Sequence, residues 1–431
     1  MLGVFAQAFR TPDLRRKLLF TLFIMMLYRL GSHIPTPGIS SENVTACLAN
    51  NDESSLIELV NMFSGGALMR LSVFALGIMP YITASIIIQL LRVVIPRFED
   101  LHKEGQAGQA KMTQYTRYLT IALGLLQSTT YVAMARAGTL MPNCPADKPL
   151  LPNDTIPNFL IMVIVMTAGT GLIMWLAELI TERGIGNGMS LLIFTGILAG
   201  MPSHVWSIAG GNSGVRNTIL LIALILIVTL AIVFVEQAQR RIPVQYAKRM
   251  VGRRMYGGST TYIPMKINMS GVIPVIFAAS LLAMPTMIAG FGKSDAAWVQ
   301  WISANFRQTS WIYLLIYALL VLFFAFFYTA ITFNPDETAE NMKKYGGFVP
   351  GKRAGRPTAE YLRYVSNRIT TAGAIYLVII AMIPMLALIA LHVQNLPFGG
   401  TTLLIMVGVG LQTVMQINAQ LQQHHYEGFL S

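Results

Sequence analysis

The sequence predicts an all-α polytopic membrane protein with ten transmembrane helices. Hydrophobic residues make up 54% of the 431-residue chain and charged residues only 12%, whereas soluble domains carry roughly 25% charged residues. A spanning helix needs about 20 mostly apolar residues, and several stretches meet that requirement without any charge. The predicted spans, in order, are 18–37, 73–94, 115–135, 157–177, 188–206, 217–237, 268–289, 311–332, 370–391 and 400–418.

Four of these spans contain long charge-free stretches, at 158–175, 217–235, 311–334 and 369–394. The first span follows a basic N-terminus but continues too far for a signal peptide and lacks a small-residue cleavage site, so we expect it to remain in the protein. Ten spans divide into two groups of five, which predicts an N-terminal half at 1–206 and a C-terminal half at 207–431. Residue-level repetition between the halves is not visible, but inverted repeats often show only weak sequence symmetry.

The segment 56–95 is too long for one span, and Gly65, Gly66, Gly77 and Pro80 interrupt it. A broken helix at membrane depth must lie against protein or line a cavity. One interpretation is a short helix at about 56–70 that enters from the outside, followed by a full span. The alternative is an amphipathic helix that lies on the outer surface.

Charge places the loops on two sides of the membrane. Most of the 31 Lys and Arg residues lie in the N-terminus and in the loops after spans 2, 4, 6 and 8. Because Lys and Arg are retained in the cytoplasm, we expect these loops and both termini to be cytoplasmic. Two of the loops, 236–266 and 334–368, are long and carry seven basic residues each. Retention alone explains much of this charge; the alternative is a surface that binds an RNA backbone or an acidic protein.

Motifs for catalysis are missing from the sequence. It contains no HExxH, no GxSxG and no Walker glycine loop. The glycines of ERGIGNG at 182–188 predict a turn between two helices, because no strand precedes them. Two cysteines and six scattered histidines indicate no metal site. We therefore expect no cofactor, no metal and no enzymatic activity.

Ionisable residues within the spans are few, which argues against a proton relay. Glu178 and Glu236 lie near the cytoplasmic ends of their spans. Arg29 lies in span 1, about one turn from the outer boundary, where its side chain can snorkel to the interface.

Isoleucines at helical spacing are the candidate functional residues within the spans. Ile78 and Ile82 are four apart, as are Ile193 and Ile197, so each pair shares one helix face. The common explanation is a lipid-facing or core isoleucine. The functional alternative is an apolar constriction, which closes a pore by dewetting.

Three polar residues lie in or beside the spans, where contact with lipid is costly. Thr83 and Gln89 belong to span 2 and Asn268 begins span 7. We expect all three to form hydrogen bonds between helices.

The chain resembles the SecY family, the channel subunits of the bacterial protein translocase, over essentially its whole length. The stretches that carry the resemblance occur in the family's order. They are NMFSGGAL at 61–68, FALGIMPYITASIIIQLL at 74–91, WLAELITERGIGNGMSLLIF at 175–194, QRRIPVQYAKR at 239–249, KINMSGVIPVIFA at 266–278, FNPDETAENMKKYGGFVPG at 333–351 and FGGTTLLI at 398–405.

The resemblance implies an hourglass pore between two pseudo-symmetric five-helix halves, closed by a short plug helix at about 56–70. Such a channel passes unfolded polypeptides across the membrane and releases hydrophobic segments sideways through a lateral gate between spans 2–3 and 7–8. By motif, the family's site residues fall on a pore ring of Ile78, Ile82, Ile193, Ile197, Ile276 and Ile405; a plug with Phe63, Ser64, Gly65 and Gly66 nearest the waist; gate residues Thr83, Gln89 and Asn268; and docking residues Arg253, Arg254 and Arg353.

The implied partners are the small membrane subunits SecE and SecG, the SecA motor ATPase, the ribosome, the preprotein or nascent substrate, and lipid. The implied location is the inner membrane of a bacterial cell. The main alternative is a secondary transporter of a small solute, which needs polar ligands at midplane on broken helices. The apolar waist argues against that alternative.

Two features depart from the family pattern. The outer loop 136–158 is long and proline-rich, and the C-terminal tail lacks a basic cluster. Cys47 and Cys144 both fall outside the membrane, where oxidation can occur. The sequence does not decide whether these two cysteines are free thiols or form a disulfide with each other.

Overall fold

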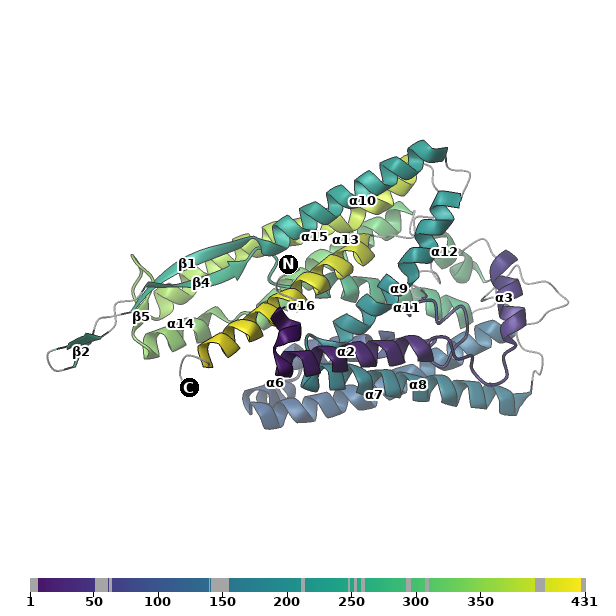
Figure 1. Ribbon diagram of the computed structural model, residues 1–431, viewed down its shortest axis with the longest axis horizontal. Coiled ribbons are helices and arrows are strands. Elements are labelled where there is room, and N and C mark those ends of the chain that lie inside the picture. Colours follow the sequence, from purple (N-terminus) through teal and green to yellow (C-terminus); the bar gives the residue numbers. More distant parts are fainter. Residues whose placement is uncertain are drawn as a thin grey trace.

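A computed structural model describes residues 7–50, 61, 64–138, 140, 155–210, 214–246, 249–251, 254–256, 260–291, 296–306, 310–391 and 400–427. The described chain is a bundle of long helices with a small β-sheet at one end (Figure 1). The helices are α2 (Pro12–Gly31), α3 (Ser41–Asn50), α5 (Met79–Val94), α6 (Pro96–Lys103), α7 (Gln106–Arg136), α8 (Ile156–Arg183), α9 (Gly188–Gly210), α10 (Gly214–Gln237), α11 (Ile273–Phe291), α12 (Ala297–Asn305), α13 (Trp311–Thr332), α14 (Pro335–Lys344), α15 (Arg356–Leu391) and α16 (Gly400–Glu427).

The helices are those of a multi-pass membrane protein. Within the described ranges, five helices are long and apolar enough to cross a membrane, and four apolar helices are shorter. The long ones are α7, α8, α13, α15 and α16, and the shorter ones lie in α5, α9, α10 and α11. The all-α fold class is confirmed, with the small sheet as an addition.

Several helices begin or end at other residues than the hydropathy pattern predicts. Span 2 was expected from residue 73, but α5 begins at Met79, because Gly77 turns the chain with a φ of +56° and Pro80 occupies the first helical turn. Span 7 was expected from residue 268, but α11 begins at Ile273. Span 1 was expected to reach residue 37, but α2 ends at Gly31 and the chain continues into a β-bridge between Pro35 and Ser72.

The basic loops fold into a sheet that sequence reasoning missed. Strand β1 (Gln239–Tyr246) pairs antiparallel with β4 (Thr260–Lys266) and with β5 (Gly347–Phe348), and β2 (Arg249–Val251) pairs with β3 (Arg254–Tyr256). Ile242 and Val244 alternate with exposed residues along β1 and pack against Leu362 of α15. The alternation of apolar and polar residues in this stretch was the sequence signal that could have predicted a strand. The sheet lies at the left of Figure 1, which we call the sheet end, and α3 lies at the opposite end.

The helices pack in two groups. Helices α2, α5, α7, α8 and α9 contact one another, and α10, α11, α13, α15 and α16 contact one another. Helix α11 also contacts α5 and α7, and α16 contacts α9 and α2. This pattern is compatible with the division at residue 206, which stays a prediction.

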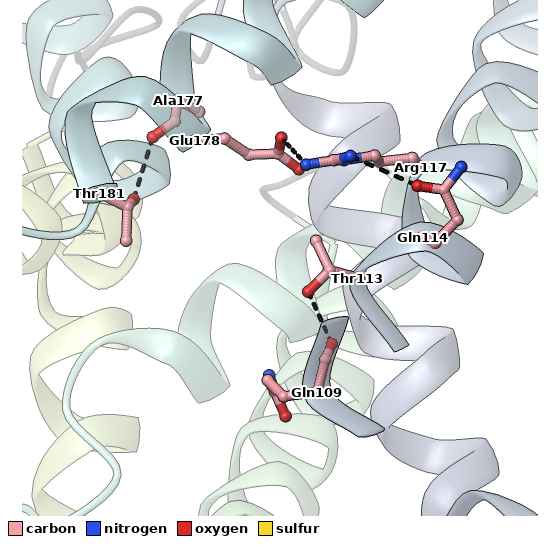
Figure 2. A network of polar contacts seen from close by, with 7 residues as sticks. All are labelled: Gln109, Thr113, Gln114, Arg117, Ala177, Glu178 and Thr181. Carbon is pink, nitrogen blue, oxygen red and sulfur yellow. Dashed lines mark hydrogen bonds and ion pairs between the residues drawn. The ribbon is translucent and has the colours of Figure 1, made fainter. Parts of the chain in front are cut away.

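An ion pair between Arg117 and Glu178 fastens α7 to α8 (Figure 2). Arg117 Nε and Nη2 donate to the two carboxylate oxygens of Glu178 at 2.9 and 2.7 Å, and the Glu178 side chain is only 12% exposed. Bidentate pairs of this kind fix orientation as well as distance. Nearby, the Gly188 N–H donates to Thr181 Oγ1 at 2.9 Å. The ERGIGNG stretch is thus the predicted turn between α8 and α9.

One cysteine is bonded. Cys47 of α3 is buried beside Val44 and Met69, and it forms a disulfide. The chain's other cysteine, Cys144, lies outside the described residues. Cys47 is therefore not a free thiol, and its pairing with Cys144 stays a prediction.

Candidate functional site

The six isoleucines of the predicted ring come from four helices and are all buried. Ile78 immediately precedes α5, and its carbonyl accepts a hydrogen bond from the Ile82 N–H at 3.1 Å, so both lie on one face. Helix α9 supplies Ile193 and Ile197. Helices α11 and α16 supply Ile276 and Ile405. All six belong to one buried apolar cluster, and none is more than 6% exposed.

A cavity of about 170 Å³ borders this cluster on the side of the sheet end. Ile276 of the cluster forms part of its wall, together with Ser190 and Gly408. The polar side chains of Glu236 and Asn268 also line it. The buried apolar cluster therefore borders a cavity with both polar and apolar walls, and the role of the six isoleucines as a ring stays a prediction.

The plug segment begins outside the described residues, where Phe63 lies. From Ser64 to residue 70 the chain forms turns, so the helix expected over 56–70 is wrong for this part. Gly65 and Gly66 have φ values of +69° and +84°, a left-handed backbone that favours glycine. These glycines build a turn and do not weaken a helix. Ser64 and Leu68 are fully buried, which favours the inserted interpretation over a surface helix.

Two side chains of α2 contact the plug segment. The Tyr28 hydroxyl donates to the Ser64 carbonyl at 3.4 Å, and Arg29 Nη1 donates to the Gly65 carbonyl at 2.7 Å. The Arg29 guanidinium therefore bonds a carbonyl of the plug segment, and the expectation that it can snorkel to the interface stays a prediction. Sequence reasoning missed this contact, and the signal for it was a charge within an otherwise apolar span.

The predicted gate residues are buried or half-buried but bond differently from expectation. Thr83 Oγ1 donates to Met79 O at 3.0 Å and Gln89 Nε2 donates to Ser85 Oγ at 3.4 Å, both within α5. The hydrogen bonds between helices expected for these two are therefore wrong.

Asn268 lies before α11 and does form such a bond. Its Nδ2 donates to Glu236 Oε1 of α10 at 2.6 Å and to the Gly271 carbonyl at 3.0 Å. The Ser270 hydroxyl donates to Asn268 Oδ1 at 3.1 Å. Asn268 thus ties the start of α11 to the end of α10, while α11 also packs on α5 and α7.

Two of the predicted docking residues, Arg254 and Arg353, lie at the sheet end. Arg253 is outside the described residues, and Arg254 begins β3, where it pairs with Val251. Arg353 is exposed in the turn between β5 and α15, and its carbonyl accepts a hydrogen bond from Thr358 Oγ1 at 2.8 Å. No described residue forms a hydrogen bond or ion pair with the Arg353 guanidinium.

Comparison with known proteins agrees with this geometry. A family model described as SecY matches residues 72–414. The protein translocase subunit SecY of Streptomyces scabiei is 59% identical, over the full length of both chains.

Two solved structures share the fold. A SecY structure, reported to show that its plug domain stabilises the closed state of the translocation channel and maintains a membrane seal, has a TM-score of 0.61 and 20% identity, over 94% of this chain and 91% of that one. Sec61 in the canine ribosome-channel complex from the endoplasmic reticulum has a TM-score of 0.56 and 18% identity over the same shares. The family match and the full-length relative together establish that this chain belongs to the SecY family.

Proposed function

We propose that this chain is the protein-conducting channel of a Sec translocon in the inner membrane of a bacterial cell, with both termini in the cytoplasm. The observation that carries the proposal is that the six isoleucines all belong to one buried apolar cluster, which borders a cavity. Gly65 of the plug segment lies against Gly196, the neighbour of Ile197. The name of the Streptomyces relative, protein translocase subunit SecY, supports it. Unfolded polypeptides pass through this cluster, between an N-terminal half at 1–206 and a C-terminal half at 207–431.

The physical role of the isoleucine ring follows from its chemistry. A translocating polypeptide presents every kind of side chain, and a ring without hydrogen-bond donors or acceptors retains none of them. Flexible apolar side chains close around an extended backbone and limit ion leakage by excluding water. In the resting state, the plug segment, including Phe63, blocks the passage.

Energy and guidance come from partners, because the chain itself catalyses no reaction and needs no cofactor. The sheet end, with Arg253, Arg254 and Arg353, docks the ribosome and the SecA motor ATPase. The likeness to Sec61 in a ribosome-channel complex supports the ribosome as a partner. The subunits SecE and SecG cover part of the apolar exterior, and lipid covers the rest.

A transport assay tests the proposal. The chain, purified with its small subunits, is reconstituted into liposomes with SecA, ATP and an unfolded preprotein that carries a signal sequence. We expect the preprotein to become protected from external protease. The secondary transporter would be favoured instead if the preprotein gained no protection from protease in the presence of ATP and the liposomes took up a small solute in a saturable way.

A side opening to lipid lies between α5–α7 and α11–α13, and Thr83, Gln89 and Asn268 belong to it. The variant Thr83→Leu is expected to shift the threshold hydrophobicity that a signal sequence needs for export. The expected shift, expressed as a transfer free energy, is about that of burying one leucine side chain, roughly 1.5–3 kcal/mol. The measurement is export of a series of signals graded in hydrophobicity. Thr371→Leu is the control, because Thr371 makes the same bond within its helix but is exposed. An unchanged threshold in Thr83→Leu would contradict the gate.

A further inference from the structure

Arg29 carries a charge within the first predicted span, and it contacts the plug segment. It lies in the last turn of α2, and its Nη1 atom is 2.7 Å from the Gly65 carbonyl oxygen. That distance is typical of a charge-assisted hydrogen bond. Among the described carboxylates, none forms an ion pair with Arg29. A charge inside a membrane span is costly and usually marks a functional contact, and here the contact is a plug carbonyl.

Residues of α2 and α9 hold the plug segment at Gly65 from two sides. Tyr28 donates to the Ser64 carbonyl, so consecutive side chains of α2 reach consecutive carbonyls of the plug segment. On its other side Gly65 lies against α9. A Cβ atom at Gly65 would be only 3.0 Å from the Gly196 Cα. The tip of the segment, residues 64–66, is therefore held between α2 and α9.

The base of the segment is held in a different way. Thr36 donates to the Leu71 carbonyl through both its hydroxyl, at 2.7 Å, and its N–H, at 3.1 Å. Leu68 and Leu71 are fully buried in a separate apolar cluster with α7 and α8. Gly66, the last residue of the tip, has no atom within 4 Å of its Cβ position other than those of its chain neighbours. The base is thus held by Thr36 and by apolar packing. The tip has local hydrogen bonds to Asn61 and Leu68. Among the described residues, only the bonds from Tyr28 and Arg29 join it to α2.

We propose that Arg29, assisted by Tyr28, is the latch that holds the plug tip in the closed channel, and that opening breaks the bond from Arg29 to Gly65 while the base stays in place. Arg29 is then a positioning residue for closure, and it contacts no substrate. The inference rests on the proposed function, because a latch has meaning only if the segment closes a pore.

Replacing Arg29 by methionine tests the latch. Arg29→Met keeps an unbranched apolar stem and removes every donor, and it also removes a charge from the membrane, so insertion should not suffer. Losing a hydrogen bond to a charged group is expected to raise the resting open fraction about tenfold to a hundredfold. The measurement is the resting ion conductance of the complete complex, with its small subunits, in planar bilayers. A second readout in cells is export of a precursor with a weakened signal sequence, which should increase.

Arg16→Met is the matched control. Arg16 belongs to the same helix, α2, carries the same charge, is exposed, and forms no hydrogen bond to the plug tip. We expect its resting conductance to equal that of the unmodified complex. An equal rise in both variants would overturn the latch in favour of a general charge effect. A second outcome would also overturn the latch: Arg29→Met leaves the resting conductance unchanged, while deletion of residues 57–67 raises it. In that case the channel function would still stand. A deletion that opens nothing would instead overturn the proposed function.

Discussion

Deletion of residues 57–67 is expected to turn the resting protein into a persistently open, poorly selective pore. The deletion removes Ser64 and Gly65, which α2 holds, and leaves the isoleucine cluster as the remaining barrier. If the closed state outweighs the open state by about 100 to 1, removing the plug's contribution raises the mean conductance on the order of a hundredfold. Single-channel recording of the purified complex in planar bilayers measures both the conductance and the ion selectivity.

The result also separates the two candidate functions. A solute transporter alternates access around a binding site and exposes no continuous pore in either state. A deleted variant that assembles with its subunits, yet shows the conductance of the intact complex, would count against the protein-conducting channel. The intact complex, prepared in the same detergent and lipid, is the reference.

The variant Arg353→Glu is expected to abolish most motor-driven transport while the complex still assembles. The Arg353 side chain is exposed beside β5 and is free of hydrogen bonds and ion pairs with the described residues, so nothing in the fold depends on its charge. We expect docking to bury Arg353 in a hydrogen-bonded charge pair, and losing one partner of such a pair costs about 2–5 kcal/mol, which corresponds to at least about a thirtyfold loss. The measurement is the rate of ATP-dependent preprotein protection in liposomes.

Arg356→Glu serves as the matched control for this variant. Arg356 lies three residues further along, is 91% exposed, and forms only a surface ion pair with Glu360 at 3.5 Å. Pairs of that kind contribute about 0–1 kcal/mol, so we expect near-normal transport and a normal yield of complex. Equal loss in both variants would show that the region responds to net charge and that Arg353 has no special place in docking.

The sequence predicts where the chain crosses the membrane but not where each helix ends. Hydropathy measures how apolar a stretch is, and residues 73–78 are as apolar as a helix although they form turns. Only the packing of Phe74 and Ile78 inside the protein makes this irregular backbone tolerable at membrane depth. Conversely, α15 begins at Arg356, well before the predicted start at residue 370, because its first turns are polar.

The candidate site was predictable in its residue types but not in its contacts. Helical spacing identifies Ile78 with Ile82 and Ile193 with Ile197, but nothing in the spacing joins them to Ile276 and Ile405. Only the resemblance to the family placed these residues together. The contact between Arg29 and Gly65 spans 36 residues and involves a backbone carbonyl, for which no side-chain pattern exists in the sequence.

Helix α15 links the β-sheet to the buried apolar cluster that contains the six isoleucines. It is 36 residues long, about 54 Å at 1.5 Å per residue, against a hydrocarbon thickness of roughly 30 Å. Its first turns pack under the sheet through Leu362 and Val365, and its later turns enter the isoleucine cluster through Leu377 and Ile380. Under the proposed function, a partner that docks on the sheet would therefore act, through this one helix, on the same cluster that contains the six isoleucines.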